Sequence, residues 1–164
     1  MGSLIDKFPQ CRNKGLPDKG ATKVLLVNSD YEPAMTLKKG LEEYGFKVYH
    51  LTNVFAAIQE IGRSKRVSYE MILCDIKEWD TEYLAFAKQI RELSHTVKIF
   101  LMSSCGIEDV VIHNAMTAGV NEIIRKPISA ENLNIVLQDY IDGSEIHSIQ
   151  HLNYDPPDSL VTSM

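Results

Sequence analysis

Short runs of consecutive apolar residues recur along the chain, and stretches with apolar residues at helical spacing separate them. The runs at 24–27, 71–74 and 99–102 show no alternation of polar and apolar positions. Uninterrupted apolar runs of this length are typical of strands that are covered on both faces of a sheet. The pattern therefore predicts strands buried between two layers of helices.

The whole pattern predicts five strands that alternate with five helices. Capping side chains precede four of the helices, and glycines end four of them. The expected strands cover 24–27, 46–51, 69–74, 97–102 and 120–125. The caps are Asp30, Asn53, Asp80 and Ser129, and the glycines are Gly45, Gly62, Gly119 and Gly143. This order predicts an α/β fold, a (βα)5 doubly wound parallel five-stranded sheet with right-handed crossovers and helices on both faces.

A length of 164 residues fits one domain with tails. Residues 1–21 hold scattered charges, two prolines and no sustained periodicity, so we expect a flexible leader there. The domain itself is expected at 22–142, and the polar residues 143–164 are interpreted as a C-terminal tail. A docking segment that folds onto a partner is the alternative interpretation of this tail.

The composition excludes several classes of protein. A formal net charge of -5 argues against direct nucleic-acid binding, because phosphate contacts need clustered lysines and arginines. No apolar stretch reaches the length of a membrane span. The three cysteines lack CxxC spacing and the five histidines share no ligand spacing, so we expect neither a disulfide framework nor a zinc site. These features favour an intracellular protein, cytoplasmic or nuclear, that contacts no membrane.

Three of the predicted strands lead into polar side chains that suit a reactive site. Asp75, Ser103 and Lys126 each follow an apolar run, and Lys126 precedes Pro127. Parallel strands end at a common edge, and open α/β sheets place their sites at the carboxyl edge. We therefore expect these three side chains to meet there.

The aspartate, the hydroxyl residue followed by a small one, and the pair Lys126-Pro127 occur in this order on a (βα)5 pattern. With this combination the chain resembles the receiver domain of two-component response regulators over residues 22–142. The resemblance implies a flavodoxin-like (CheY-like) sheet with strand order 2-1-3-4-5. It also implies that Asp75 stands at the phosphoacceptor position and that Ser103 and Lys126 stand at positions that contact the phosphoryl group. Phosphoryl transfer depends mainly on positioning and on neutralising the charge of the oxygens.

The first predicted strand departs from the family pattern. It ends on Asn28, Ser29 and Asp30, where the family usually has an acidic pair that carries Mg²⁺. These three positions are interpreted as a degenerate acidic pair. Mg²⁺ relies on carboxylate ligands, and Asp75 is the clear anionic ligand that is left, with Lys126 to balance its charge. We therefore expect no metal site and no cofactor beyond weak Mg²⁺ binding at Asp75.

Two more positions depart from the family pattern. Ile123 stands at the switch position, where the family usually has an aromatic residue that couples phosphorylation to the output face. Lys77 falls near the phosphoacceptor position and would add positive charge to the edge. Together with the lost acidic pair, these departures indicate a degenerate receiver of the pseudo-receiver, or pseudo-response regulator, type.

The sequence thus predicts a pseudo-receiver signalling module of a two-component or phosphorelay-type pathway. It is expected not to be an enzyme, to have no catalytic residue, and to act through protein–protein interaction with weak or absent Mg²⁺-dependent aspartyl phosphorylation. The alternative is a functional phosphoacceptor response regulator in which Asp75 receives a phosphoryl group from a phosphohistidine donor. A purely structural pairing of Asp75 with Lys126 also stays open.

The resemblance implies partners among signalling proteins: a histidine kinase, a phosphotransfer protein or a transcriptional regulator, with a homodimer as a further option. The expected contact face is built by the fourth helix, the fifth strand and the fifth helix. Its named positions are Val110, Val111, His113, Asn114, Ile123 and Arg125. On this interpretation, a charged residue in place of Ile123 weakens partner binding while the fold persists.

Overall fold

The computed structural model of the protein describes residues 20–63, 68–79 and 81–143. The leader predicted at 1–21 and the tail predicted at 143–164 lie outside this part, apart from residues 20, 21 and 143. The cap predicted at Asp80 also lies outside the described residues. Within the described part, strands and helices alternate as the sequence predicts.

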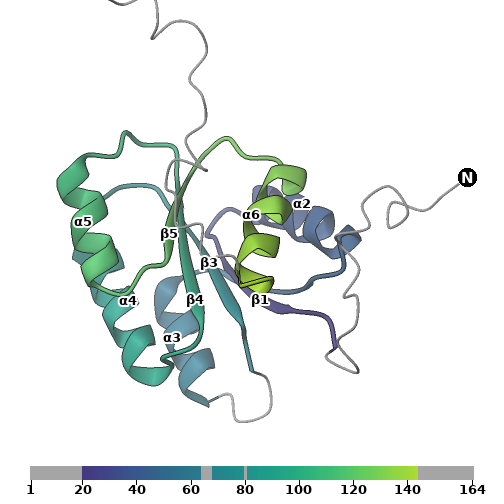
Figure 1. The fold of residues 1–164 in the computed structure, drawn as a ribbon, viewed down its shortest axis with the longest axis horizontal. Helices are drawn as coiled ribbons and strands as arrows, with labels where there is room; N and C mark the ends of the chain where they lie inside the picture. Colours follow the sequence, from purple (N-terminus) through teal and green to yellow (C-terminus); the bar gives the residue numbers. More distant parts are fainter. Residues whose placement is uncertain (1–19, 64–67, 80, 144–164) are drawn as a thin grey trace, which may run out of the picture.

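The strands form one parallel sheet in the order β2-β1-β3-β4-β5 (Figure 1). They are β1 (Lys23–Val27), β2 (Lys47–Leu51), β3 (Met71–Ile76), β4 (Lys98–Ser103) and β5 (Glu122–Arg125). The order confirms the predicted doubly wound fold with strand order 2-1-3-4-5.

Helices cover both faces of the sheet (Figure 1). They are α2 (Tyr31–Glu43), α3 (Val54–Arg63), α4 (Thr81–Leu93), α5 (Asp109–Thr117) and α6 (Ala130–Ile141). Helices α2 and α6 pack on one face, and α3, α4 and α5 pack on the other. In the part of the chain that the structure describes, no helix is long and apolar enough to span a membrane.

The strand β1 shows why the apolar runs carry no polar alternation. Leu25 and Val27 belong to the core cluster under α3, α4 and α5. Val24 and Leu26 belong to the cluster under α2 and α6. All four side chains are at most 2% exposed. Since successive residues of a strand point to opposite faces, burial on both faces requires a continuous apolar run.

The predicted helix ends agree with the structure in most places. The side chains of Ser129 and Asn53 each accept a hydrogen bond from the backbone N–H three residues further on, at 3.1 and 2.8 Å. Asp30 stands at the N-cap position of α2, but its side chain makes no capping hydrogen bond. The prediction that Gly62 ends α3 is wrong, because the helix runs on to Arg63. A glycine weakens a helix interior by about 1 kcal/mol and does not end it alone.

The strand β3 begins and ends two residues later than predicted, which fixes the position of Asp75. The sequence places the end of this strand at residue 74, whereas β3 continues to Ile76. Asp75 therefore lies inside the strand and pairs in register with Met102 of β4. The backbone that carries its carboxylate is held by the sheet, because β-ladder pairing extends to this residue.

Candidate functional site

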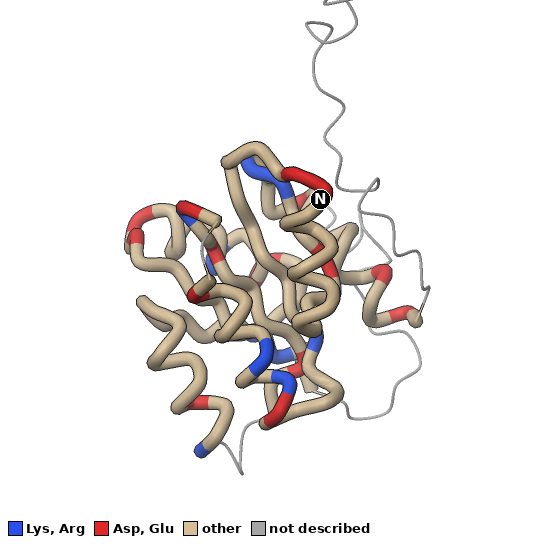
Figure 2. The backbone as a smooth tube through the Cα atoms, turned by 90° about the vertical axis from the view of Figure 1, so that its left-hand side faces the viewer, with Lys and Arg blue, Asp and Glu red and all other residues tan. Residues whose placement is uncertain are grey.

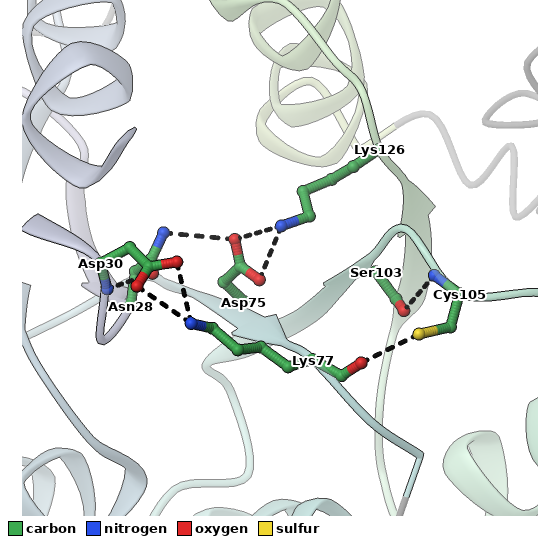
Figure 3. Close-up of polar contacts among 7 residues, drawn as sticks. All are labelled: Asn28, Asp30, Asp75, Lys77, Ser103, Cys105 and Lys126. Carbon is green, nitrogen blue, oxygen red and sulfur yellow. Dashed lines mark hydrogen bonds and ion pairs between the residues drawn. The ribbon is translucent and has the colours of Figure 1, made fainter. Parts of the chain in front are cut away.

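The carboxylate of Asp75 lies at the carboxyl edge of the sheet, in contact with the ammonium of Lys126 (Figure 3). Lys126 Nζ is 2.8 Å from Asp75 Oδ1 and 2.6 Å from Oδ2. The aspartate side chain is 8% exposed and the lysine side chain is 31% exposed. Charge-assisted hydrogen bonds of this length are among the stronger polar contacts in proteins. Both oxygens of the carboxylate are thus engaged by one cation.

Lys126 reaches Asp75 from the loop that follows β5. Its backbone N–H donates to the carbonyl oxygen of Ser103 at 2.8 Å, which ties the start of this loop to the end of β4. The peptide bond between Lys126 and Pro127 is cis. The chain then turns into α6, whose N-terminus is capped by Ser129. Lys126 is therefore placed by its neighbours on both sides.

Asn28 links the first strand to the same carboxylate. Its backbone N–H donates to Leu51 O at 3.0 Å, and its carbonyl oxygen lies 2.8 Å from Nε2 of His50. Its side-chain oxygen accepts from the backbone N–H of Asp30 at 2.8 Å. With that oxygen occupied, the amide nitrogen points to Asp75 and donates to Oδ2 at 3.2 Å. Asn28 is 4% exposed, so the amide has a fixed environment.

Asp30 and Lys77 form a second pair of opposite charges beside the first (Figure 3). Lys77 Nζ lies 2.9 Å from each carboxylate oxygen of Asp30. The lysine and aspartate side chains are 57% and 54% exposed, so water screens their attraction. Ser29, between Asn28 and Asp30, is exposed. The positive charge predicted from Lys77 is therefore present near the edge, and it is directed at Asp30.

The hydroxyl of Ser103 is engaged by the loop after β4. Its hydroxyl is fully buried and accepts a hydrogen bond from the backbone N–H of Cys105 at 3.1 Å. The thiol of Cys105 in turn donates to the carbonyl oxygen of Lys77 at 2.9 Å. In Figure 3 this group lies on the other side of β3's end from Asn28. Ser103 is joined to Lys126 through its backbone carbonyl, and the side-chain hydrogen bonds among the three predicted residues join Asp75 and Lys126.

The charges of the two ion pairs cancel. Asp30 and Asp75 contribute -2, and Lys77 and Lys126 contribute +2. In the described ranges, no group of three or more histidine, cysteine, aspartate or glutamate side chains is placed to hold a metal ion. Next to the site, burial raises the pKa of the Cys74 thiol, and the charge of Asp75 raises it further. Cys74 therefore stays a protonated, apolar core residue.

Ile123 does not lie on the surface, and the interpretation that it contacts partners is wrong. It is 1% exposed and belongs to the core cluster under α3, α4 and α5. Ile123 and Arg125 stand two residues apart on β5 and so belong to the same face of the strand. Helices cover this face at Ile123, whereas Arg125 is exposed at the end of the strand. Val110 is 58% exposed, and His113 and Asn114 are also exposed on α5.

A separate cavity of about 270 Å³ opens at the opposite edge of the sheet. It is lined by residues at the amino ends of β1, β3 and β4 and by the end of α6, including Thr22, Glu70, Lys98 and Tyr140. The amino ends of parallel strands lie here, far from the carboxyl ends that hold Asp75. This cavity is not part of the charged site.

Three contacts at the carboxyl edge were missed by sequence reasoning. They are the Asn28–Asp75 hydrogen bond, the pairing of Asp30 with Lys77, and the approach of His50 to the backbone of Asn28. His50 could have been considered because it stands near the end of a predicted strand, next to the strand that leads to Asn28. The other two depend on how β1 and β3 are aligned.

Charged residues elsewhere are mixed in sign. In Figure 2 the basic segments stand among acidic ones, and those drawn in colour form no continuous basic stripe in that view.

Comparisons with known proteins agree with this fold. A family model described as the response regulator receiver domain matches residues 24–138. A two-component response regulator from Clostridium difficile has 28% sequence identity and a TM-score of 0.65, with 76% of this chain and 98% of that chain covered. A receiver domain protein (CheY-like) from Methanospirillum hungatei has 19% identity and a TM-score of 0.67, with 79% and 100% covered.

Relatives that are similar in sequence differ in length from this chain. The chemotaxis protein CheY of Bacillus subtilis is 25% identical over 113 residues, which cover 69% of this chain and 92% of that protein. The transcriptional regulatory protein ZraR of Salmonella typhimurium is 20% identical over 120 residues, which cover 73% of this chain. Those residues cover 26% of ZraR, so the chain spans about a quarter of that regulator.

Proposed function

Since the chain belongs to the response regulator receiver domain family and is thus a receiver domain of two-component signalling, we propose that it is a pseudo-receiver. It acts through contacts with other signalling proteins and is not an enzyme. Phosphorylation of Asp75 in the presence of Mg²⁺ is weak or absent. The partners have the chemistry of two-component pathways: a histidine kinase, a phosphotransfer protein or a transcriptional regulator.

The observation that carries this proposal is the state of the Asp75 carboxylate. Lys126 engages both of its oxygens, and the amide of Asn28 donates to one of them. An aspartyl phosphate carries one more negative charge than the free carboxylate. The second nearby cation, Lys77, is already paired with Asp30. The two pairs are therefore balanced for the unmodified aspartate, and the added charge of a phosphoryl group meets two lysines, Lys126 and Lys77, that already have carboxylate partners.

The contact surface proposed for partners is the side of the molecule formed by α5, the edge strand β5 and α6. Val110 on α5 and Ile135 on α6 are large apolar side chains that are 58% and 43% exposed. Arg125 is exposed at the end of β5, between the two helices in the chain. Exposed apolar side chains with a neighbouring arginine are a composition that protein interfaces favour. Ile123 lies beneath this surface and supports it from the core.

A second candidate function is that of a working phosphoacceptor. The observation in its favour is that Asp75 and Lys126 stand together at the carboxyl edge, as the family's chemistry requires. The carboxylate is mostly buried but its partner lysine is partly exposed, so movement of Lys126 would open a path to Asp75.

The test is incubation of the protein with Mg²⁺ and acetyl phosphate, followed by intact-mass spectrometry. The same experiment on the Asp75→Asn variant is the control, because the amide keeps the shape of the side chain and removes the nucleophile. We expect no added phosphoryl mass in either protein. A labile adduct on the wild-type chain that the variant lacks would refute the pseudo-receiver proposal and establish the phosphoacceptor.

A further inference from the structure

We infer that the carboxyl edge is closed to divalent cations by its own side chains, with Asn28 as the residue that decides this and Lys77 as a second barrier. The inference rests on the proposed function, because it names the physical cause of the weak Mg²⁺-dependent chemistry. It concerns metal binding alone, so it can be tested separately from phosphorylation.

Asn28 presents the wrong atom to a cation. A side-chain amide has one oxygen that can ligate a hard cation and one nitrogen that only donates hydrogen bonds. The backbone N–H of Asp30 occupies the oxygen at 2.8 Å, which turns the nitrogen toward Asp75. The hydrogen-bond network therefore fixes which way this amide points, and the face that it shows to Asp75 carries N–H groups.

Both carboxylates at the edge are already occupied by ammonium groups. Lys126 contacts the two oxygens of Asp75, and Lys77 contacts the two oxygens of Asp30. A divalent cation would have to displace at least one of these ammonium groups. It would also add two positive charges to a group of four residues that is neutral without it. Mg²⁺ needs near-octahedral oxygen ligands and usually one or two carboxylates that are free to bind it.

The two barriers differ in strength because they differ in burial. Asn28 is 4% exposed and its amide nitrogen lies 3.2 Å from Asp75 Oδ2. Both side chains of the Lys77–Asp30 pair are more than half exposed, so solvent screens their attraction. Removing Lys77 therefore increases the affinity of the Asp30 carboxylate for Mg²⁺ only a little. A carboxylate in place of the Asn28 amide would stand close to Asp75 in a buried position. A cation would gain more binding free energy from this change than from the removal of Lys77.

The experiment measures Mg²⁺ binding by isothermal titration and by the rise of Tm with Mg²⁺ concentration. The proteins are the wild type, Asn28→Asp, Lys77→Ala and the double variant of these two. Lys39→Ala is the matched control, since Lys39 is an exposed lysine on α2 beyond its first turn. Any variant that binds the cation when folded shows a Tm that increases with concentration, by mass action.

We expect the wild type and Lys39→Ala to show no Tm change up to millimolar Mg²⁺. Asn28→Asp should have a lower Tm than the wild type in chelator and should bind Mg²⁺ at least about tenfold more tightly, because it adds a charge next to Asp75. In the double variant, Lys77→Ala should increase the Mg²⁺ affinity of Asn28→Asp by a further factor of about two to five, as expected for a screened pair.

Tight Mg²⁺ binding by the wild type, with a Kd below the millimolar range, would overturn the inference. So would an Asn28→Asp chain that folds and binds Mg²⁺ no better than the wild type. If that variant does not fold, the titrations of the wild type and of Lys77→Ala still test the inference. A tenfold gain in the Mg²⁺ affinity of Lys77→Ala would contradict the ranking of Asn28 as the stronger barrier and Lys77 as the weaker one. A phosphoryl adduct at Asp75 without Mg²⁺ binding would instead refute the proposed function and leave this inference standing.

Discussion

Replacing Lys126 with methionine should destabilise the fold far more than replacing Asp75 with asparagine. The carboxylate of Asp75 is 8% exposed, and after Lys126→Met it would keep one donor, the amide of Asn28, which lies 3.2 Å away in the wild type. Removing one partner of a fully buried ion pair costs about 3–5 kcal/mol, and an exposed pair contributes about 0–1 kcal/mol. Lys126 is 31% exposed, so water reaches part of the vacated position. We therefore expect a loss of about 2 kcal/mol in the free energy of unfolding.

In Asp75→Asn the charge that loses its partner is that of Lys126. The ammonium of Lys126 can turn toward water, and the new amide oxygen still accepts a hydrogen bond, so the loss should be roughly 0.5–1 kcal/mol. Urea unfolding followed by circular dichroism measures both values. The double variant Asp75→Asn/Lys126→Met is the decisive control, because it holds no unpaired charge and should be more stable than Lys126→Met alone. Equal losses in the two single variants, or a double variant as unstable as their sum, would refute this reasoning.

Three further predictions concern the core, the helix contact and the pH dependence. Ile123→Glu should abolish the cooperative unfolding transition because it buries an unpaired charge in the core, whereas Arg125→Glu at the exposed end of β5 should leave the transition within about 0.5 kcal/mol. Gly40→Ala should destabilise the fold by about 1–3 kcal/mol in urea unfolding, since the new Cβ would stand 2.5 Å from a side chain of α6. Gly62→Ala should stabilise it by about 0.5–1 kcal/mol, because its nearest side chain would lie 3.8 Å away. A more stable Gly40→Ala than Gly62→Ala would contradict this packing. Burial, followed by a hydrogen bond to a glutamate, raises the pKa of Tyr69 in the folded state. The contribution of Tyr69 to the free energy of unfolding should therefore be complete below its unfolded pKa of about 10 and should fall as the pH rises further. Tyr69→Phe should flatten the resulting fall of Tm above pH 10, and an unchanged slope would exclude this tyrosine as its source.

The sequence was sufficient to predict the fold because of the apolar runs. Their length indicates strands, and their lack of polar alternation indicates that helices cover both faces of the sheet. The runs that form β1, β3 and β4 are buried on both faces, as their lack of alternation predicts. The helix boundaries follow from capping chemistry at Asn53 and Ser129. Gly62 shows the limit of this reasoning, since a glycine inside a packed helix and a glycine that ends a helix look alike in the sequence.

Ile123 shows a second limit, which concerns faces rather than elements. The sequence marks it as part of β5, and that assignment is right. Whether a strand residue faces the core or a surface depends on which helices cover the sheet, and both faces of this sheet are covered. An apolar residue in such a strand is buried on either face, and in β5 the exposed position is Arg125, beyond the last core residue.

The pairing at the carboxyl edge follows from the alignment of two strands. In the parallel pair β1–β3, Val24 lies beside Met71 and Val27 beside Cys74, a constant separation of 47 residues. The same separation joins Asn28 to Asp75 and Asp30 to Lys77 beyond the end of β1. Since side chains two residues apart in extended chain point the same way, one register places both pairs on the same side.

This register could not be predicted from the apolar runs. A strand with one polar face fixes its alignment, because a slip by one residue would bury polar side chains. The runs of β1 and β3 are apolar on both faces, so a shifted alignment would bury the same kinds of side chain. The charged residues after the strands supply the missing constraint. A slip by one residue would separate Asn28 from Asp75 and Asp30 from Lys77 together, so the neutral cluster that we propose excludes metal also favours the observed alignment of the two central strands.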